Sequence, residues 1–457
     1  MKKRREQLEE LDREALIEGY LLLEDRVRSL EKQVNDLRQL LGSRLAKTPQ
    51  NSSIPSGQSR KANKKDATKA KRGPKPGHPG KSRVRSEPDE IIECRVARCP
   101  VCGEDLSLLP QHVAGRHQII DIPPLRPIVR EVVRYGRYCP RCGHYHRVET
   151  PAGFERGRTV GVHVERLVLY LHYAHPLSYQ RVQRILAEVC GITLSEGALV
   201  NIVERAKAAL KQGAEAIHRQ IKQATVVGSD ETGVRVAGMN AWQWVFQTPS
   251  LAYYVIRPSR AAQVLQTVMA DAHPQVWVSD VLSAQMCHPA TDYQICLAHQ
   301  VRDLQYAIDA HQCAWAAQMQ ALFHQAMSLG KHRHTLSAAV YQQLVLTIER
   351  HLDSLLKNYP SHEDSQRLWR RYHKHRHALF VFLDREDVPP TNNASEQALR
   401  NSVIYRKVTG GFRTDWGAEL YANLLSILET ARRQGRTILD TLSMFLARQP
   451  TFSWIGE

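Results

Sequence analysis

Two short apolar segments that each end in Ser-Asp constrain this chain more than any other feature. Residues 224–230 are Ala-Thr-Val-Val-Gly-Ser-Asp, and residues 275–280 are Gln-Val-Trp-Val-Ser-Asp. Short runs rich in β-branched residues are typical of buried strands. Val234 and Val236 alternate with polar residues beyond Asp230, so we expect an open sheet edge or a turn there. The pattern predicts a sheet with Asp230 and Asp280 at strand ends.

A third carboxylate, Glu396, lies far downstream in the segment Asn-Asn-Ala-Ser-Glu. Asn and Ser favour helix starts, so we place Glu396 in the first turn of a helix. Mg²⁺ prefers oxygen ligands, and two such ions about 4 Å apart promote phosphodiester chemistry. The three carboxylates therefore suggest a site for two Mg²⁺ or Mn²⁺ ions. A plainer interpretation stays open, in which the aspartates form turns and Glu396 stabilises a helix dipole.

The basic residues are concentrated in one segment. The 457-residue chain is long enough for several domains and has a net charge of +17, which indicates a nucleic-acid partner. Residues 43–86 hold thirteen Lys or Arg and one acid, Asp66. Their Pro, Gly and Ser content cannot bury a core, so residues 43–88 are expected to be a disordered tether or, alternatively, a solubilising linker. As a tether it would hold DNA phosphates through residues such as Lys64, Lys65, Lys71 and Arg72.

The N-terminal residues 1–42 carry a seven-residue repeat. Leucines occupy positions 16, 23, 30 and 37, a pattern that favours a parallel two-stranded coiled coil and hence a homodimer. An amphipathic helix packed on its own protein is the alternative. The chain has no run of eighteen apolar residues, and its charged start does not resemble a signal peptide. We therefore expect a cytoplasmic, nucleoid-associated protein without a membrane partner.

Residues 89–157 contain two Cys-Pro-x-Cys-Gly knuckles. Such paired spacing is a strong signal for a zinc ribbon with one tetrahedral, structural Zn²⁺. The knuckles would supply the four thiolates, with His144 or His146 as alternatives to one of them: Cys99, Cys102, Cys139 and Cys142. Four thiolates leave no open position for water, and the alternating residues 129–138 predict a ribbon strand.

The remaining segments predict a split α/β domain. In residues 158–222 we expect helices at 162–173, 178–189 and 196–210, with Ser195 as an N-cap. They resemble a helix-turn-helix unit, although a plain helical bundle has the same pattern. Three strands, a helix and two further strands over residues 223–300 have the order of a ribonuclease H-like mixed sheet. Residues 301–388 would form a helical insertion, residues 389–435 the second part of the core, and residues 436–457 an apolar tail.

Several motifs together resemble one family. They are the heptad start, Asn51-Ser-Ser, both knuckles, Asp230-Glu-Thr, Cys296-Leu-Ala-His299-Gln-Val-Arg302, and residues 392–400 followed by Arg406-Lys407. Nearly the whole chain resembles a DD(E) transposase of insertion-sequence family sixty-six, a multidomain α/β protein with a ribonuclease H-like core. This resemblance implies Asp230, Asp280 and Glu396 as the catalytic triad. Asp292 is the fallback for Asp280, because Val281-Leu-Ser-Ala replaces the turn that the family usually has.

The resemblance also implies an activity and partners. The chain would bind transposon ends, cleave to free 3′-hydroxyls and join them to target DNA, with or without accessory proteins. Residues near the scissile bond would hold phosphates, unless Arg400 and Arg406 only pair with helix carboxylates: His299, Arg302, Arg400, Arg406 and Lys407. The alternatives are a nuclease without strand transfer and a non-catalytic DNA-binding protein. A zinc hydrolase is disfavoured because the predicted zinc site is closed.

Overall fold

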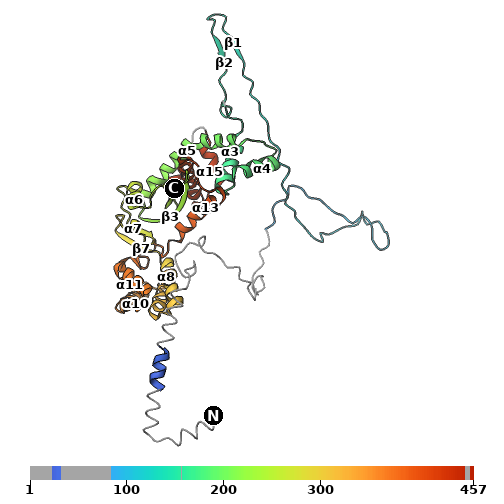
Figure 1. The fold of residues 1–457 in the computed structure, drawn as a ribbon. Helices are drawn as coiled ribbons and strands as arrows, with labels where there is room; N and C mark the ends of the chain where they lie inside the picture. Colours follow the sequence, from blue (N-terminus) through green and yellow to red (C-terminus); the bar gives the residue numbers. More distant parts are fainter. Residues whose placement is uncertain (1–22, 32–83, 156, 448–452, 457) are drawn as a thin grey trace, which may run out of the picture. The chain divides into compact units, whose positions relative to one another are not determined.

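A computed structural model of the protein describes residues 23–31, 84–155, 157–447 and 453–456 (Figure 1). Residues 23–31 are helical, with Leu23, Val27 and Leu30 exposed. The basic tether with Lys64, Lys65, Lys71 and Arg72, and the rest of the heptad repeat, lie outside the described residues and stay predictions. The chain divides into two units, one of residues 60–129 and 189–191 and the other of the remaining residues.

The segment of the second knuckle forms a small antiparallel ribbon. Strand β1 (Gly136–Tyr138) pairs with β2 (Tyr145–Arg147) in the register Arg137 to His146. The predicted strand over residues 129–138 is therefore wrong except for its last three residues. Only those three have a strand partner among the described residues, and Val133 and Tyr135 remain exposed.

Helices precede the large sheet, as predicted. They are α3 (Val162–Leu169), the π-helix η2 (Tyr170–Ala174), α4 (Tyr179–Cys190) and α5 (Glu196–Gln223). The Ser195 hydroxyl accepts a hydrogen bond from the Ala198 amide at 3.2 Å, which confirms the predicted N-cap. Helix α5 ends at Gln223, thirteen residues beyond the predicted end at Leu210. It continues because Ile217 and Ile221 follow Leu210 at helical spacing, and all three side chains are buried in the core.

The central sheet has five strands in the order β5-β4-β3-β6-β7. Strands β3, β4 and β5 form an antiparallel meander, while β6 and β7 run parallel to β3. Helix α6 (Ala262–Met269) joins the two halves, and α7 (Ser283–Met286) connects β6 to β7. The strands are β3 (Val226–Val236), β4 (Met239–Gln247), β5 (Ala252–Arg257), β6 (Val276–Ser279) and β7 (Asp292–Ile295).

The predicted hairpin at residues 241–257 is confirmed by β4 and β5. The prediction that Asp230 ends its strand is wrong. Pairing of β3 with β6 stops at Gly228, but pairing with β4 continues from Gly228 to Val236. Asp230 therefore lies within β3, two residues beyond Gly228, the last residue of β3 that pairs with β6.

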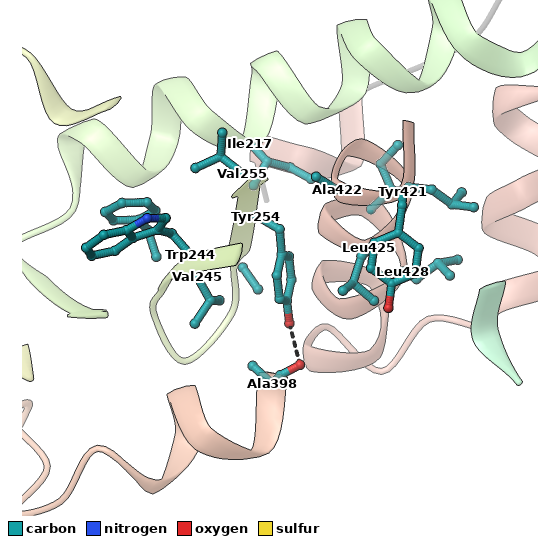
Figure 2. Close-up of a cluster of buried hydrophobic side chains, with 14 of the residues drawn as sticks. Ile217, Trp244, Val245, Tyr254, Val255, Ala398, Tyr421, Ala422, Leu425 and Leu428 are labelled. Carbon is teal, nitrogen blue, oxygen red and sulfur yellow. Dashed lines mark hydrogen bonds between the residues drawn. The ribbon is translucent and has the colours of Figure 1, made fainter. Parts of the chain in front are cut away.

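Two long helices cover the antiparallel half of the sheet. Helix α14 (Asp415–Arg433) packs on β5 and α5. The Tyr254 hydroxyl of β5 donates a hydrogen bond to the Ala398 carbonyl of α13 (Asn393–Thr409) at 3.0 Å (Figure 2). The hydroxyls of Ser426 and Thr430 accept hydrogen bonds from the Tyr254 and Ala252 amides at 2.9 and 3.1 Å. Helix α14 thus satisfies donors on edge strand β5 that would otherwise be unpaired.

The C-terminal segment belongs to this core. Helix α15 (Ile438–Phe445) packs on α3, and the described residues end with the 3₁₀ turn η5 (Ser453–Gly456). Phe445 and Trp454 are buried. A Cβ on Gly213 of α5 would lie 2.3 Å from the Phe445 ring. Only glycine lets Phe445 approach α5 this closely, so α15 together with Trp454 and Ile455 packs into this core, beyond the apolar tail that we predicted.

The segment between the two parts of the sheet domain is helical, as predicted. Its helices are α8 (Leu297–His311), α9 (Ala314–Lys331), α10 (Ala338–Leu356), α11 (Glu363–Lys374) and α12 (Val381–Asp384), with 3₁₀ turns at Arg333–Thr335 and Arg376–Ala378. They share a second apolar core with Val276 and Val278 of β6. Among the described residues, no helix is both long and apolar enough to cross a membrane.

Candidate active site

The register of β3 and β6 places Asp230 and Asp280 at the same level. Gly228 pairs with Val278, and each aspartate follows two residues later. Because paired residues of parallel strands share a face and side chains alternate with a period of two, both carboxylates are directed to the face on which Gly228 lies. The segments 224–230 and 275–280 thus meet at the carboxyl ends of neighbouring strands.

Helix α13 brings Glu396 to the same face. The buried Asn392 side chain donates a hydrogen bond from Nδ2 to the Ser229 carbonyl at 2.7 Å and accepts one at Oδ1 from the Ser395 hydroxyl at 2.6 Å. A Cβ on Gly228 would lie 3.2 Å from Ser395 Oγ and only 2.2 Å from Gln247 Nε2. The start of α13 is therefore seated directly on β3, with Glu396 in its first turn as predicted.

His299 connects two of the three carboxylates. It lies in the first turn of α8, where its Nδ1 is 3.0 Å from Asp280 Oδ1 and 3.5 Å from Glu396 Oε1. One turn later, Arg302 Nη2 donates to Glu396 Oε1 at 3.1 Å. Helix α8 thus places two cationic side chains beside the carboxylates, and in this structure both contact protein carboxylates.

The electrostatics are those of a crowded acidic site. Burial, and then the charges of Asp280 and Glu231, hold the pKa of Asp230 well above its ordinary value. Burial alone would lower the pKa of His299, but its contacts with Asp280 and Cys296 outweigh burial and raise the pKa to about 11. His299 is therefore an imidazolium at neutral pH. The carboxylates thus face the imidazolium of His299 and the guanidinium of Arg302, and a divalent ion would compensate their charge more strongly.

A network of hydrogen bonds around Glu231, on the opposite face of β3, was not predicted from the sequence. The buried Glu231 carboxylate accepts hydrogen bonds from Arg260 Nε at 2.8 Å and Gln285 Nε2 at 2.6 Å. Gln285, on α7, also accepts from Trp277 Nε1 at 3.4 Å. Glu231 thus ties β3 to the helix that follows Asp280. Its position directly after Asp230, in the motif Asp-Glu-Thr, was the available signal.

Three of the five predicted phosphate-binding residues near the site contact other protein groups, and the other two are exposed. His299 and Arg302 contact the carboxylates, and Arg406 donates from Nη1 to Thr232 Oγ1 at 3.1 Å and to the Gly233 carbonyl. Arg406 therefore pairs with β3 rather than with a helix carboxylate. Arg400 and Lys407 are exposed on α13. Both remain accessible to a DNA backbone.

A cavity of about 480 Å³ adjoins the Arg406 side chain near the turn of the β3–β4 hairpin. Its lining includes Arg235, Trp242 and Arg406. The Arg260 guanidinium lies over the Trp242 ring, 4.8 Å from its centroid. Cationic and aromatic groups of this kind suit a nucleic-acid strand.

Asp292, the fallback for Asp280, is excluded by the topology. It pairs with Val276 at the beginning of β7, whereas Ile295 pairs with Ser279 at the other end. Asp292 therefore lies at the amino ends of the parallel strands and Asp280 at their carboxyl ends. The unusual residues after Asp280 lead into α7, which begins at Ser283, and leave Asp280 beside Asp230.

The two cysteine knuckles have matching local geometry. In the first, the Gly103 amide donates to the Cys99 carbonyl at 2.9 Å, and the Cys99 amide to the Glu104 carbonyl at 2.8 Å. In the second, the Gly143 amide donates to the Cys139 carbonyl at 2.8 Å. Gly103 and Gly143 have φ values of +79° and +69°, which glycine adopts without strain.

The knuckle backbone favours thiolates. Hydrogen bonds from the Cys102 and Val101 amides lower the pKa of Cys99, and those from the Cys142 and Arg141 amides lower the pKa of Cys139. A thiolate is the form that binds metal. His144 Nδ1 lies 2.9 Å from the Cys142 carbonyl, to which it donates.

A model of the transposase IS66 family matches residues 159–420, more than half of the chain. The chain belongs to the IS66 transposase family. A second model, the zinc-finger binding domain of transposase IS66, matches residues 97–143 and includes both knuckles. Insertion-sequence family sixty-six is thus confirmed, and the segment with both knuckles matches the zinc-finger model of that family.

The chain is also similar to an uncharacterized protein, y4jO, from Sinorhizobium fredii. The two are 28% identical over 165 residues, which is 36% of this chain and 44% of the relative. The chain thus spans less than half of the curated relative that it matches. The similarity to y4jO covers one segment of each chain. The activity of the whole protein is therefore inferred from the site.

Proposed function

We propose that this chain is a DD(E) transposase that binds transposon ends, cleaves to free 3′-hydroxyls and joins them to target DNA. The observation that carries the proposal is the convergence of Asp230, Asp280 and Glu396 around His299. The three carboxylates come from β3, the end of β6 and α13, which are separated by up to 166 residues in sequence. Their proximity is a property of the fold, and turn formation or helix capping does not account for it.

The sheet topology supports a ribonuclease H-like core. A three-stranded antiparallel meander, a helix and two strands parallel to the first give the order β5-β4-β3-β6-β7. In this arrangement the first and fourth strands are neighbours, so acidic residues near their ends meet. Helices α8 to α12 form the proposed insertion, and α13 returns to the sheet with the third carboxylate.

The donor set fits two Mg²⁺ or Mn²⁺ ions. Asp230, Asp280 and Glu396 offer carboxylate oxygens, the ligands that hard divalent ions prefer. Burial, and then the charges of Asp280 and Glu231, raise the pKa of Asp230, and a divalent ion would stabilise its ionised form. When bound, such a pair of ions would activate the attacking oxygen and stabilise the leaving one in an in-line displacement.

The side chains of the chain itself would hold the reacting groups in place. Asn392 fixes α13 to β3, so Glu396 is held at a constant distance from the strand aspartates. Arg302 and His299 orient the Glu396 carboxylate, and on substrate binding they are close enough to turn toward a phosphate. Arg400 and Lys407 would hold the DNA backbone farther along α13. Water attacks the phosphorus at the transposon end, and its P–O3′ bond breaks to release a 3′-hydroxyl. This hydroxyl then attacks a target phosphorus, whose own P–O3′ bond breaks to release a target 3′-hydroxyl.

The two knuckles are proposed to bind one structural Zn²⁺ through all four cysteines. Matching hydrogen bonds and lowered thiol pKa values at Cys99 and Cys139 support this. The N-terminal helix is proposed to form a dimer, which the exposed apolar residues Leu23, Val27 and Leu30 of its described part support.

The decisive experiment is Mg²⁺- or Mn²⁺-dependent cleavage and joining of a transposon-end duplex. Asp230→Ala and Glu396→Ala proteins would be compared with wild type after retained zinc and DNA binding have been verified. Loss of both products in both variants is the expected result. Unchanged activity would contradict the site. Cleavage without joined products in the wild type would indicate the nuclease alternative, and end binding without cleavage would indicate a non-catalytic protein.

A further inference from the structure

The described residues contain one cluster whose ligand types differ from those of a magnesium site. One ligand atom from each of Asp280, Cys296 and His299 lies within 4.8 Å of the others. We propose that these three residues form a binding site for a thiophilic divalent ion of the zinc class. The site is distinct in chemistry from the knuckles and shares only Asp280 with the proposed magnesium site.

The fold builds this cluster from adjacent parallel strands. Ile295 pairs with Ser279, so Cys296 and Asp280 follow at the same level of β7 and β6. Cys296 is also the N-cap residue of α8, which places His299 one turn further on. A Cys-x-x-His pair across a strand end and a helix start thus meets a strand-end aspartate. The separation of 3.0 Å between His299 Nδ1 and Asp280 Oδ1 is close to that of two ligands on one tetrahedral ion.

The donor set selects the class of ion. Mg²⁺ takes oxygen ligands and rarely binds sulfur, whereas Zn²⁺ binds thiolate, imidazole and carboxylate in tetrahedral sites. The Cys296 side chain is fully buried, and its Sγ accepts a hydrogen bond from the Asn392 amide at 3.1 Å. That contact orients the sulfur toward the cluster.

The ligand atoms are already close enough to share one ion. His299 Nδ1 lies 3.0 Å from Asp280 Oδ1, and the Cys296 Sγ lies within 4.8 Å of the ligand atoms of both residues. A divalent ion would replace the imidazole and thiol protons and satisfy both ligands with one charge centre. Three protein ligands leave a fourth position open to water or to Glu396 Oε1, which lies 3.5 Å from His299 Nδ1.

A functional consequence follows if the proposed function is right. An ion bound to Asp280, Cys296 and His299 withdraws Asp280 from the magnesium pair. Zinc would then inhibit cleavage in competition with Mg²⁺, because both ions would use the Asp280 carboxylate. This consequence rests on the proposed function, whereas the metal site itself does not.

The test is the zinc content of the full-length chain, measured by mass spectrometry after loading with Zn²⁺ and gel filtration. Cys296→Ser and His299→Ala should each hold one zinc fewer per chain than wild type. Cys313→Ser is the matched control, because Cys313 is also buried and also precedes a helix, and it should retain the wild-type content. A Cys99→Ser protein should lose the finger zinc and keep this one.

Equal zinc content in wild type, Cys296→Ser and His299→Ala would overturn the proposal. Thermal unfolding of each protein establishes that a lost zinc does not reflect a lost fold. If Cys296→Ser does not fold, His299→Ala decides alone. The zinc concentration for half-inhibition of cleavage should rise at least about tenfold in Cys296→Ser. A chain that shows no cleavage in any form would fail the proposed function, yet its zinc content would still decide the metal site.

Discussion

The cysteine knuckles and the carboxylate site are both metal-site candidates, but they are built over very different lengths of chain. Each knuckle is organised by hydrogen bonds within six residues, such as Cys99 to Glu104. The carboxylates come from three elements and meet only because β3, β6 and α13 pack together. A local site can be damaged without affecting the core, whereas the assembled site depends on contacts far from its ligands.

The largest expected effect separates the two sites. Cys102→Ser should abolish zinc binding at the finger, whose binding free energy is on the order of 10 kcal/mol in structural zinc sites. Mn²⁺ binding and the unfolding of the sheet domain should stay at wild-type values. Cys94→Ser changes an exposed cysteine outside the knuckles and should retain the zinc. Loss of Mn²⁺ binding in Cys102→Ser would show that the two sites are coupled.

A second change should damage the assembled site through its support. Asn392→Ala leaves the Ser229 carbonyl and the Ser395 hydroxyl without their buried partner, which should lower the free energy of unfolding by about 3 kcal/mol. Because α13 is then held less firmly, Mn²⁺ affinity should fall about tenfold.

The matched control for Asn392 is Asn401→Ala on the same helix. Asn401 donates to the Tyr173 carbonyl at 3.2 Å and is only partly buried, so its loss should cost about 1 kcal/mol and leave Mn²⁺ affinity unchanged. Equal Mn²⁺ affinities in Asn392→Ala and wild type, measured by calorimetric titration, would show that Asn392 does not position Glu396.

The other end of α13 should make stability depend on pH. Burial lowers the pKa of His172 to about 4, although its hydrogen bond to the Leu177 carbonyl acts in the opposite direction. Its Nδ1 donates to that carbonyl, so Nε2 accepts from the Tyr405 hydroxyl of α13 at 3.2 Å. His172, in the π-helix η2, thus bonds both Tyr405 of α13 and the Leu177 carbonyl before α4, and its Nε2 must be unprotonated to accept from Tyr405.

The folded-state pKa of His172 lies below its unfolded value of about 6.5. Its contribution to stability is therefore complete above pH 6.5 and is lost as the pH falls toward 4. Between pH 7.5 and 5 the free energy of unfolding should decrease by about 2 kcal/mol more in wild type than in His172→Gln. Denaturant unfolding at both pH values measures this difference, and identical pH dependence in the two proteins would refute it.

The smallest effects are expected on the exposed face of α13. Arg400→Ala and Lys407→Ala should each lower the slope of log affinity against log salt concentration by about 1 without a change in stability. Arg406→Ala is the contrast, because Arg406 donates to the backbone of β3 and its loss should reduce stability. Salt-dependent DNA binding by fluorescence anisotropy checks the slopes, and unchanged slopes would place the DNA elsewhere.

The same contrast explains how far the sequence could predict the molecule. Cys-Pro-x-Cys-Gly fixes a turn locally, and Asn392-Asn-Ala-Ser-Glu396 fixes a helix start, so both were predictable. The length of β3 beyond Asp230 was not, because pairing with β4 rather than the local pattern decides where the strand ends. The role of Asn392 was equally hidden, since its side chain serves β3 instead of capping its own helix.

The cationic residues show the same limit. The resemblance to the family indicated His299 and Arg302 as residues that would hold phosphates, but the sequence could not show that they contact carboxylates. Arg406, six residues beyond Arg400, points to β3 because of the helical period and the packing of α13. Glu231 was overlooked because it alternates with Asp230 and its partners, Arg260 and Gln285, come from later elements.

The most direct test of the central claim is a calorimetric titration of Mn²⁺ into zinc-loaded protein. Asp230→Asn, Asp280→Asn and Glu396→Gln should each weaken Mn²⁺ binding by more than about tenfold. In wild type, binding should release protons and tighten as pH rises, because the pKa of Asp230 is raised. Mn²⁺ bound as tightly by all three variants as by wild type would contradict the claim that these carboxylates form one metal site.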